Sequence, residues 1–150
     1  MCAQHSEARA ATLAAVVAAP LVRMVQTRLR AQAPPPARPP DSLALASALD
    51  ALFTCAHVGR AALHTELLHE VLVLALAGVR SADVLARMGS LKLLGCALAA
   101  TADDRDAWGP QPAADELVQQ VHETLASAAK QDVSEDVRRL AEGLLRILAA

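Results

Sequence analysis

The chain has 150 residues and a formal net charge of −2, which suits one domain with a buried core. Hydrophobic residues make up 54% of it and aromatic residues only 1%, and 35 Ala and 24 Leu dominate the composition. Ala and Leu favour helices, whereas sheets prefer β-branched and aromatic side chains, so this composition predicts an all-α protein. It excludes disorder over most of the chain. No run of about 18 uncharged apolar residues occurs, so we expect no membrane span.

Charge is divided unevenly along the chain. Residues 1–40 carry five Arg and one Glu, whereas residues 41–150 carry nine basic and fifteen acidic residues. An acidic body without Tyr, and with one Phe and one Trp, lacks the basic surface and the stacking side chains of nucleic-acid-binding proteins. The cysteines are too few for a disulfide framework, so we expect a reducing compartment, the cytoplasm or the nucleus. They are Cys2, Cys55 and Cys96.

The first 32 residues allow three interpretations. Apolar residues from Leu13 to Leu29 have helical spacing, which predicts a helix from Ser6 to about Arg30 that is bent at Pro20. The same stretch is basic and poor in acidic residues, like a mitochondrial transit peptide, and it also resembles a weak secretory signal. We favour the packed helix. A mitochondrial protein with a cleaved N-terminal peptide is the alternative.

Residues 33–40 read APPPARPP and divide the sequence. Five prolines in eight residues exclude a helix, so we expect an extended, polyproline-like linker. The spacing of Pro36 and Pro39 around Arg38 also occurs in SH3 ligands, but a spacer is the simpler interpretation. We therefore predict an N-terminal helix over residues 1–32, a linker over 33–40 and a helical domain over 41–150.

Five helices are predicted after the linker, from caps, breakers and apolar periodicity. The second and third of them are apolar on nearly every side, so they should be surrounded by other helices. In chain order, the five run from a cap at Asp41–Ser42 to Gly59, from Ala61 to Ala77 before Gly78, from Ala82 to Thr101 behind a cap at Ser81, from Ala113 to Lys130, and from a cap at Ser134 to the end.

The helix over 82–101 should be the centre of the core. Leu91, Leu94 and Leu98 share one face, and this helix contains few charges. Gly89 and Gly95 each cost about 1 kcal/mol relative to Ala in a helix interior, so close packing of neighbouring helices explains them best. Further apolar residues are assigned to inward faces: Val84 and Leu85 on this helix, Val118 on the next, and Ile147 and Leu148 on the last.

The histidines and cysteines form no convincing site. His69-Glu70 and His122-Glu123 begin like a zinc-protease helix, but neither has the second His. His57 and His64 are separated by a turn, and His64 and His69 point apart on a helix. Cys55-Ala56-His57 has no partner pair elsewhere.

The acidic stretch after the central helix resembles the start of a calcium loop. Asp103, Asp104 and Asp106 are present, but Trp108 and Ala114 stand where such a loop needs Gly and Glu. No phosphate loop and no nucleophile elbow occur in the sequence. We therefore expect no enzymatic activity, no cofactor, no metal ion and no small-molecule substrate.

The end of the chain carries the pattern D-x-x-x-D-V-R-x-L-A-x-x-L-L over Asp132–Leu145, which resembles a helix of HEAT or armadillo repeats. The segment Ser42–Gly78 is similar in length to one armadillo-like repeat, with a turn at Val58–Arg60. The resemblance extends from Asp41 to the end. It implies a short α-solenoid of about five to six helices, stacked as hairpins and presenting a groove to a protein partner.

The function implied by this resemblance is that of a non-enzymatic protein–protein interaction scaffold. The chain could equally be the C-terminal part of a longer solenoid, because its last helix is charged outside as a capping repeat would be. A ligand-binding helical bundle is a further alternative.

Three residues are candidates for partner binding. Trp108 is either a lid over helix ends or an exposed anchor for a partner. Arg139 and Arg146 lie seven residues apart on one side of the last helix, while Arg138 is placed to pair with Glu142. Arg139 and Arg146 should therefore be the least compensated charges, and we expect them to attract an acidic partner segment.

Overall fold

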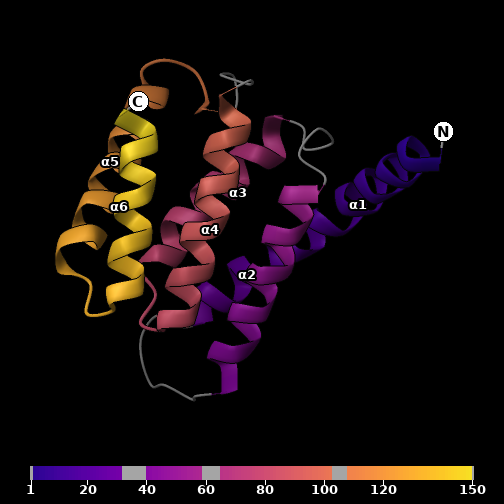
Figure 1. The fold of residues 1–150 in the computed structure, drawn as a ribbon. Helices are drawn as coiled ribbons and strands as arrows, with labels where there is room; N and C mark the ends of the chain where they lie inside the picture. Colours follow the sequence, from indigo (N-terminus) through magenta and orange to yellow (C-terminus); the bar gives the residue numbers. More distant parts are fainter. Residues whose placement is uncertain (1, 32–39, 59–64, 103–107, 150) are drawn as a thin grey trace.

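The computed structural model describes residues 2–31, 40–58, 65–102 and 108–149, and all regular secondary structure in these residues is helical. The predicted all-α class is therefore confirmed (Figure 1). The helices are α1 (Cys2–Ala31), α2 (Pro40–Val58), α3 (Thr65–Val79), α4 (Val84–Thr101), α5 (Ala113–Gln131) and α6 (Glu135–Ala149).

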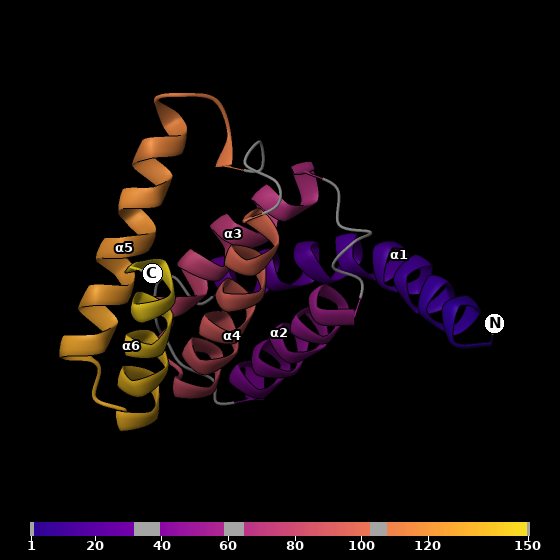
Figure 2. The ribbon, with the colours of Figure 1, turned by 45° about the horizontal axis from the view of Figure 1, so that its top comes forward.

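Successive helices pair as hairpins: α1 packs on α2, α3 on α4, and α5 on α6. The hairpins then stack in two layers, which are visible when the views of Figures 1 and 2 are compared. In one layer α4 lies between α2 and α6, and in the other α3 lies between α1 and α5. We call these the even layer and the odd layer.

This pairing differs from the unit that the sequence indicated over Ser42–Gly78. The main contacts of α2 are with α1 and α4, not with α3. Ala18, Val22 and Val25 of α1 are fully buried in the same core, so α1 completes the first hairpin across residues 33–40. Residues 33–39, and the predicted turn beyond Val58, lie outside the described residues.

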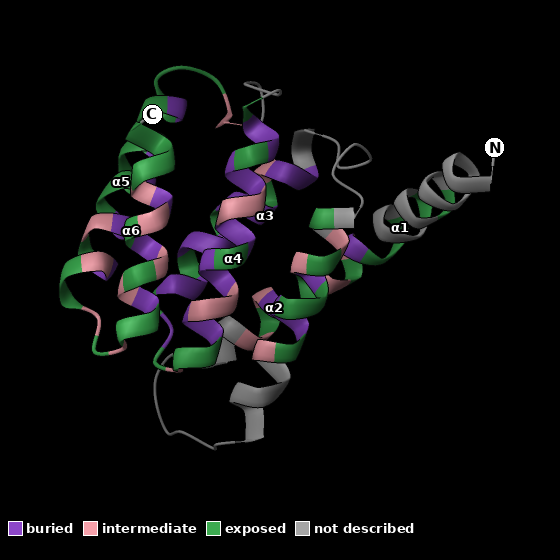
Figure 3. Cartoon of the chain, in the orientation of Figure 1, coloured by how far each residue is buried: buried purple, intermediate pink, exposed green. Residues whose placement is uncertain are grey.

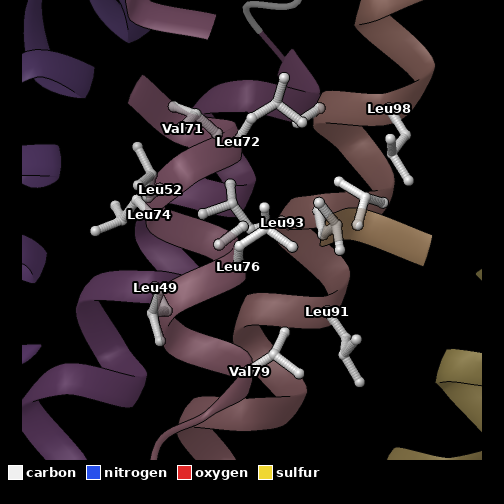
Figure 4. Packing of buried hydrophobic residues seen from close by; sticks show 14 of the residues in the cluster. Leu49, Leu52, Val71, Leu72, Leu74, Leu76, Val79, Leu91, Leu93 and Leu98 are labelled. Carbon is white, nitrogen blue, oxygen red and sulfur yellow. The ribbon is translucent and has the colours of Figure 1, made fainter. Parts of the chain in front are cut away.

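The core consists of Leu, Val and Ala side chains, and α4 is at its centre as predicted. Leu91, Leu94 and Leu98 are buried, and α4 packs against α2, α3 and α6. Figure 4 shows leucines of α2, α3 and α4 gathered between these helices. Figure 3 shows the complementary pattern, in which α5 and α6 have buried inner faces and exposed outer faces.

By length and composition α4 could also cross a membrane, and it is the one helix in the described ranges that meets this criterion. Its sequence nevertheless contains Arg87 and Lys92, so the uncharged apolar run that we looked for is absent. A central helix of a helical core meets the same criterion.

Gly89 and Gly95 lie at close approaches of α4 to its neighbours α2 and α6. A Cβ atom on Gly89 would be 3.1 Å from Leu49 Cβ of α2, and one on Gly95 would be 3.0 Å from Leu144 Cδ2 of α6. The prediction that close packing explains these two glycines is therefore confirmed.

Gly78 was expected to end its helix, but it lies inside α3 and is buried. A Cβ atom there would be 1.9 Å from Ser90 Oγ, so this glycine permits the close packing of α3 on α4. Its role was misassigned because a packing glycine and a C-terminal glycine look alike in a sequence.

Two of the three predicted caps were wrong. α2 begins at Pro40, so Asp41 and Ser42 lie in its first turn. Proline is well suited to a first helical position, where its missing N–H costs nothing. The cap of α4 is Asp83 rather than Ser81, because its carboxylate accepts a hydrogen bond from Ala86 N at 2.9 Å.

The cap at the last helix was predicted correctly. Ser134 Oγ accepts a hydrogen bond from Val137 N, and α6 begins at the next residue after Ser134.

Five apolar residues assigned to inward faces are exposed. They lie in the first turn of α4, on the outer side of α5 and in the last turn of α6, where no neighbouring helix covers them. The apolar face inferred from periodicity was therefore wider than the contact that each helix makes. The five are Val84, Leu85, Val118, Ile147 and Leu148.

α1 begins at Cys2, earlier than expected, and continues through Pro20. Because proline has no N–H, the carbonyl of Val16 loses its helical partner. Pro20 and Val16 are both exposed, so water can satisfy this carbonyl and the helix tolerates the proline.

Candidate functional site

The strongest candidate site is a cavity of about 620 Å³ between α3 and α5, in the odd layer. Trp108, just before α5, forms one end of it. The remaining lining residues are apolar or acidic, with one histidine and one glutamine: His69, Glu70 and Val73 from α3, and Gly109, Pro110, Ala113, Glu116, Leu117 and Gln120 from the start of α5.

Local structure fixes the position of Trp108. Gly109 has a φ of 91°, which side chains other than glycine rarely adopt, and it turns the chain toward α5. Pro110 O then accepts a hydrogen bond from Ala114 N at 3.0 Å, so the segment is tied to the first turn of α5. Trp108 itself is half-buried and packs against the core, as the lid interpretation expected, while part of the ring lines the cavity.

A second cavity, of about 440 Å³, lies at the other end of the same helix pair. Its lining residues on α5 continue the face that lines the first cavity, at spacings of three and four residues. The two cavities lie one after the other along the same face of α5, and we call them together the α3–α5 groove. The second cavity is lined by Val79, Arg80, Glu123, Thr124, Ser127, Ala128, Gln131 and Asp132.

Carboxylates outnumber basic groups along this groove. Glu70 and Glu116 line the end near Trp108 and are exposed, and Glu123 lines the other end. Arg80 is the one lysine or arginine among the lining residues. The exposed Val73, with 47% of its surface accessible, lines the Trp108 end together with Glu70 and Glu116.

A largely buried ion pair lies at the far end of the groove, where Asp132 is a lining residue. Arg87 of α4 donates from Nε to Asp132 Oδ2 at 2.8 Å and from Nη2 to Asp132 Oδ1 at 3.1 Å. Its Nη1 donates to the carbonyls of Ser81 and Ala82, in the turn before α4. Asp132 lies in the turn between α5 and α6, so this pair joins the second hairpin to the third.

The surroundings of Asp132 stabilise its charged form. Burial raises the pKa of this carboxyl, but hydrogen bonds from Ser134 N and Arg87, with the charges of Arg87 and Arg138, outweigh it and hold the pKa below its usual value of 3.8. Arg138 also donates to the carbonyl of Asp132. The pair is therefore charged at neutral pH, with bidentate geometry.

The ion pairs that we expected on the last helix were wrong. Arg139 pairs with Glu135, and Arg146 lies 3.9 Å from Glu142, each one helical turn away. Arg138, which was expected to pair with Glu142, instead binds the turn before α6. Arg139 and Arg146 are thus compensated within α6, although both remain exposed. Their role in partner binding stays a prediction.

The histidines, cysteines and acidic stretch that the sequence offered as possible sites do not form a common site among the described residues. His57 is exposed and stacks on Phe53 with ring centroids 5.9 Å apart. Neither Cys55 nor Cys96 forms a disulfide bond with a described residue, and burial raises the pKa of the Cys55 thiol. His64 and the Asp103–Asp106 stretch lie outside the described residues. Within the described ranges, no three His, Cys, Asp or Glu side chains are grouped so that they could hold a metal ion.

Sequence reasoning missed Arg87, Asp132 and Val73. Arg87 and Asp132 are 45 positions apart, and no local pattern connects them. A single arginine within an apolar helix was the available signal, because a buried charge requires a partner. Val73 lies in a helical segment with apolar residues on every side. The sequence therefore did not show that no other helix covers the side that contains Val73.

Comparisons with known proteins give no relative for this chain: no protein-family model, no curated protein and no solved structure matches it. A function for this chain must therefore be inferred from the groove, its charges and the way the hairpins are stacked.

Proposed function

We propose that this chain is a non-enzymatic protein–protein interaction scaffold, built as a short α-solenoid of the HEAT or armadillo type. The observation that carries this proposal is the α3–α5 groove, which contains Trp108 and the uncovered Val73. Exposed apolar groups within a groove rimmed by polar residues are typical of protein-binding surfaces.

The stacking of the helices supports the solenoid part of the proposal. Each hairpin has its main contacts with the next hairpin along the chain. A closed bundle would bring the first and last hairpins together, whereas a solenoid joins neighbouring units only. The described part of the chain comprises three such units.

The groove has the chemistry to hold a peptide segment. Val73, Trp108 and Leu117 offer an apolar floor for one or two apolar side chains of the partner. Glu70 and Glu116 at the rim would accept hydrogen bonds or ion pairs from it. A partially exposed tryptophan in such a groove has the features of a binding hot spot.

The packing of α1 favours the scaffold over a mitochondrial protein that loses its N-terminal peptide. Ala18, Val22 and Val25 are fully buried against the remainder of the core. Cleavage after α1 would expose the apolar surface that they cover, at a cost of about 25 cal/mol per Å². We therefore propose that α1 remains part of the protein, in the cytoplasm or the nucleus.

The proposal can be tested by quantitative affinity purification with three forms of the full-length protein. One is the wild type, one carries Val73→Glu in the groove, and the control carries Val118→Glu on the outer side of α5. Val73 and Val118 are 47% and 48% exposed, so the two changes are matched in chemistry and in burial. Only Val73 lines the groove.

We expect a protein that is recovered with the wild type and with Val118→Glu, and that is lost with Val73→Glu. Circular dichroism should show the same helix content in all three forms, because neither valine is in the core. The proposal is wrong if every recovered protein binds the two variants equally.

A further inference from the structure

α1 presents a second surface, independent of the groove. Its N-terminal part extends beyond the other helices in both views (Figures 1 and 2). Val16, Pro20 and Met24 are spaced four residues apart on one side of it, and Val16 and Met24 are 68% and 48% exposed. The partly exposed Val17 adjoins them. The buried residues of α1 lie on the opposite side.

Two arginines share this exposed side. Arg9 and Arg23 are each seven residues from Val16, so the three lie in one line along the helix. Both arginines are exposed, and neither forms an ion pair with a described residue. We call this surface, formed by Arg9, Val16, Val17, Pro20, Arg23 and Met24, the basic–apolar face of α1.

The two ends of the array therefore differ in charge. On α6 the exposed Arg139 and Arg146 are each paired with a glutamate one turn away. The sequence of α1 contains four arginines and only one acidic residue, Glu7. On α1, the exposed Arg9 and Arg23 form no such ion pair with a described residue.

We propose that the basic–apolar face of α1 binds an acidic amphipathic helix of a partner protein. Val16, Pro20 and Met24 would contact the apolar stripe of that helix, and Arg9 and Arg23 would pair with its carboxylates. The charges argue against a second copy of this chain, because two α1 helices would bring uncompensated arginines together. A partner with acidic flanks is attracted instead.

A protein helix fits this face better than an anionic membrane surface does. Helices that lie in a membrane interface usually insert Trp, Phe or Leu on their apolar side. Among the side chains of this face that the structure describes, the exposed apolar ones are two valines, a proline and a methionine. Methionine is common on surfaces that bind helices, because its flexible side chain adapts to the partner.

The test uses the full-length protein and two synthetic helical peptides with leucine at every third and fourth position. One peptide has glutamate at its other positions, and the second has lysine there. Fluorescence anisotropy of labelled peptides gives the affinities at low and high salt. We expect the acidic peptide to bind at least about tenfold more tightly than the basic one, and to weaken as salt screens the charges.

Three variants assign the binding to this face. Arg9→Glu with Arg23→Glu, and separately Val16→Glu, should each weaken acidic-peptide binding about tenfold or more. Lys92→Glu with Lys130→Glu, at exposed positions of α4 and α5, makes the same charge change elsewhere and should leave binding within about twofold. All these side chains are exposed, so helix content measured by circular dichroism should not change.

Vesicles of phosphatidylcholine with phosphatidylserine are tested in parallel. The proposal is overturned if the acidic peptide does not bind, if the reversal at Lys92 and Lys130 weakens binding as much as the α1 reversal, or if only the vesicles bind and lose binding in the α1 variants.

Discussion

The even and odd layers of the array are packed differently, although the same three hairpins form both. In the even layer, α4 approaches α2 at Gly89 and α6 at Gly95. In the odd layer, α3 and α5 have few mutual contacts, and the α3–α5 groove lies between them. The glycines of α4 thus allow the helices of the even layer to pack closely. Because the same hairpins form both layers, α3 and α5 of the odd layer are left further apart.

A chain with few aromatic residues thus forms a continuous core and still leaves apolar side chains open to solvent in one layer. The even layer and the hairpin contacts bury the leucines, whereas the odd layer leaves Val73 and part of Trp108 accessible. Four changes test this division, from the largest expected effect on stability to the smallest.

The Arg87–Asp132 pair should be the most sensitive point. Arg87→Met leaves Asp132 charged and buried without its partner, so we expect a loss of about 3–5 kcal/mol in the free energy of unfolding, measured by urea denaturation. Arg87→Met combined with Asp132→Asn removes both charges and should lower the free energy of unfolding by less than Arg87→Met alone. Equal losses in the single and double variants would show that the ion pair is not what joins the second and third hairpins.

Leu94→Ala in the core should have a much larger effect on stability than a substitution in the groove. Leu94 is fully buried on α4, so its truncation should cost about 2–5 kcal/mol. Val73→Ala in the groove should change stability by less than about 0.5 kcal/mol, because surface substitutions have small effects. Thermal melts of both variants provide the measurement. A melt of Leu94→Ala that matches the wild type would show that α4 is not the central helix.

Gly89→Ala tests whether glycine closes the even layer. The new Cβ would be 3.1 Å from Leu49 Cβ, close to the backbone of α2, so the overpacking should cost about 1–3 kcal/mol. Gly143→Ala on α6 is the control. A Cβ there meets nothing within 4 Å, so the better helix propensity of alanine should stabilise the protein by about 0.5–1 kcal/mol. Stabilisation by both changes would refute the packing role of Gly89.

The lowered pKa of Asp132 predicts a modest dependence of stability on pH. Because the folded state holds this pKa below its unfolded value, the contribution is complete above about pH 4 and is lost as the pH falls through the folded pKa. The stability difference between the wild type and Asp132→Asn should therefore be constant near neutral pH and should narrow below about pH 4. A difference that does not narrow in acid would contradict this assignment.

Local signals in the sequence were sufficient for the class of the fold and for most of its helices. The spacing of Leu91, Leu94 and Leu98 identified the central helix, and the serine before α6 identified its start. Features that depend on contacts between different helices could not be predicted from these local signals. Gly78 was read as a helix end because nothing in the sequence indicates that Ser90 packs against it.

The candidate site could be predicted only in part. Trp108 was singled out as a lone large side chain, and it lines the groove. Arg139 and Arg146 were singled out by their charge, but the rotamers of Glu135 and Glu142, which compensate them, are not fixed by spacing alone. The pairing of Arg87 with Asp132 requires knowledge of how the hairpins stack, which the sequence does not contain in any local pattern.

We propose that a protein partner occupies the α3–α5 groove beside Trp108. Trp108 is the one tryptophan of the chain, so protein labelled with fluorotryptophan gives a single resonance in fluorine NMR that reports on this groove. The measurement is a titration with the partner that Val118→Glu retains. We predict that the resonance shifts or broadens and saturates at the same partner concentration in the wild type and in Val118→Glu, and stays unchanged in Val73→Glu. A partner that binds the wild type without perturbing this resonance would contradict the account.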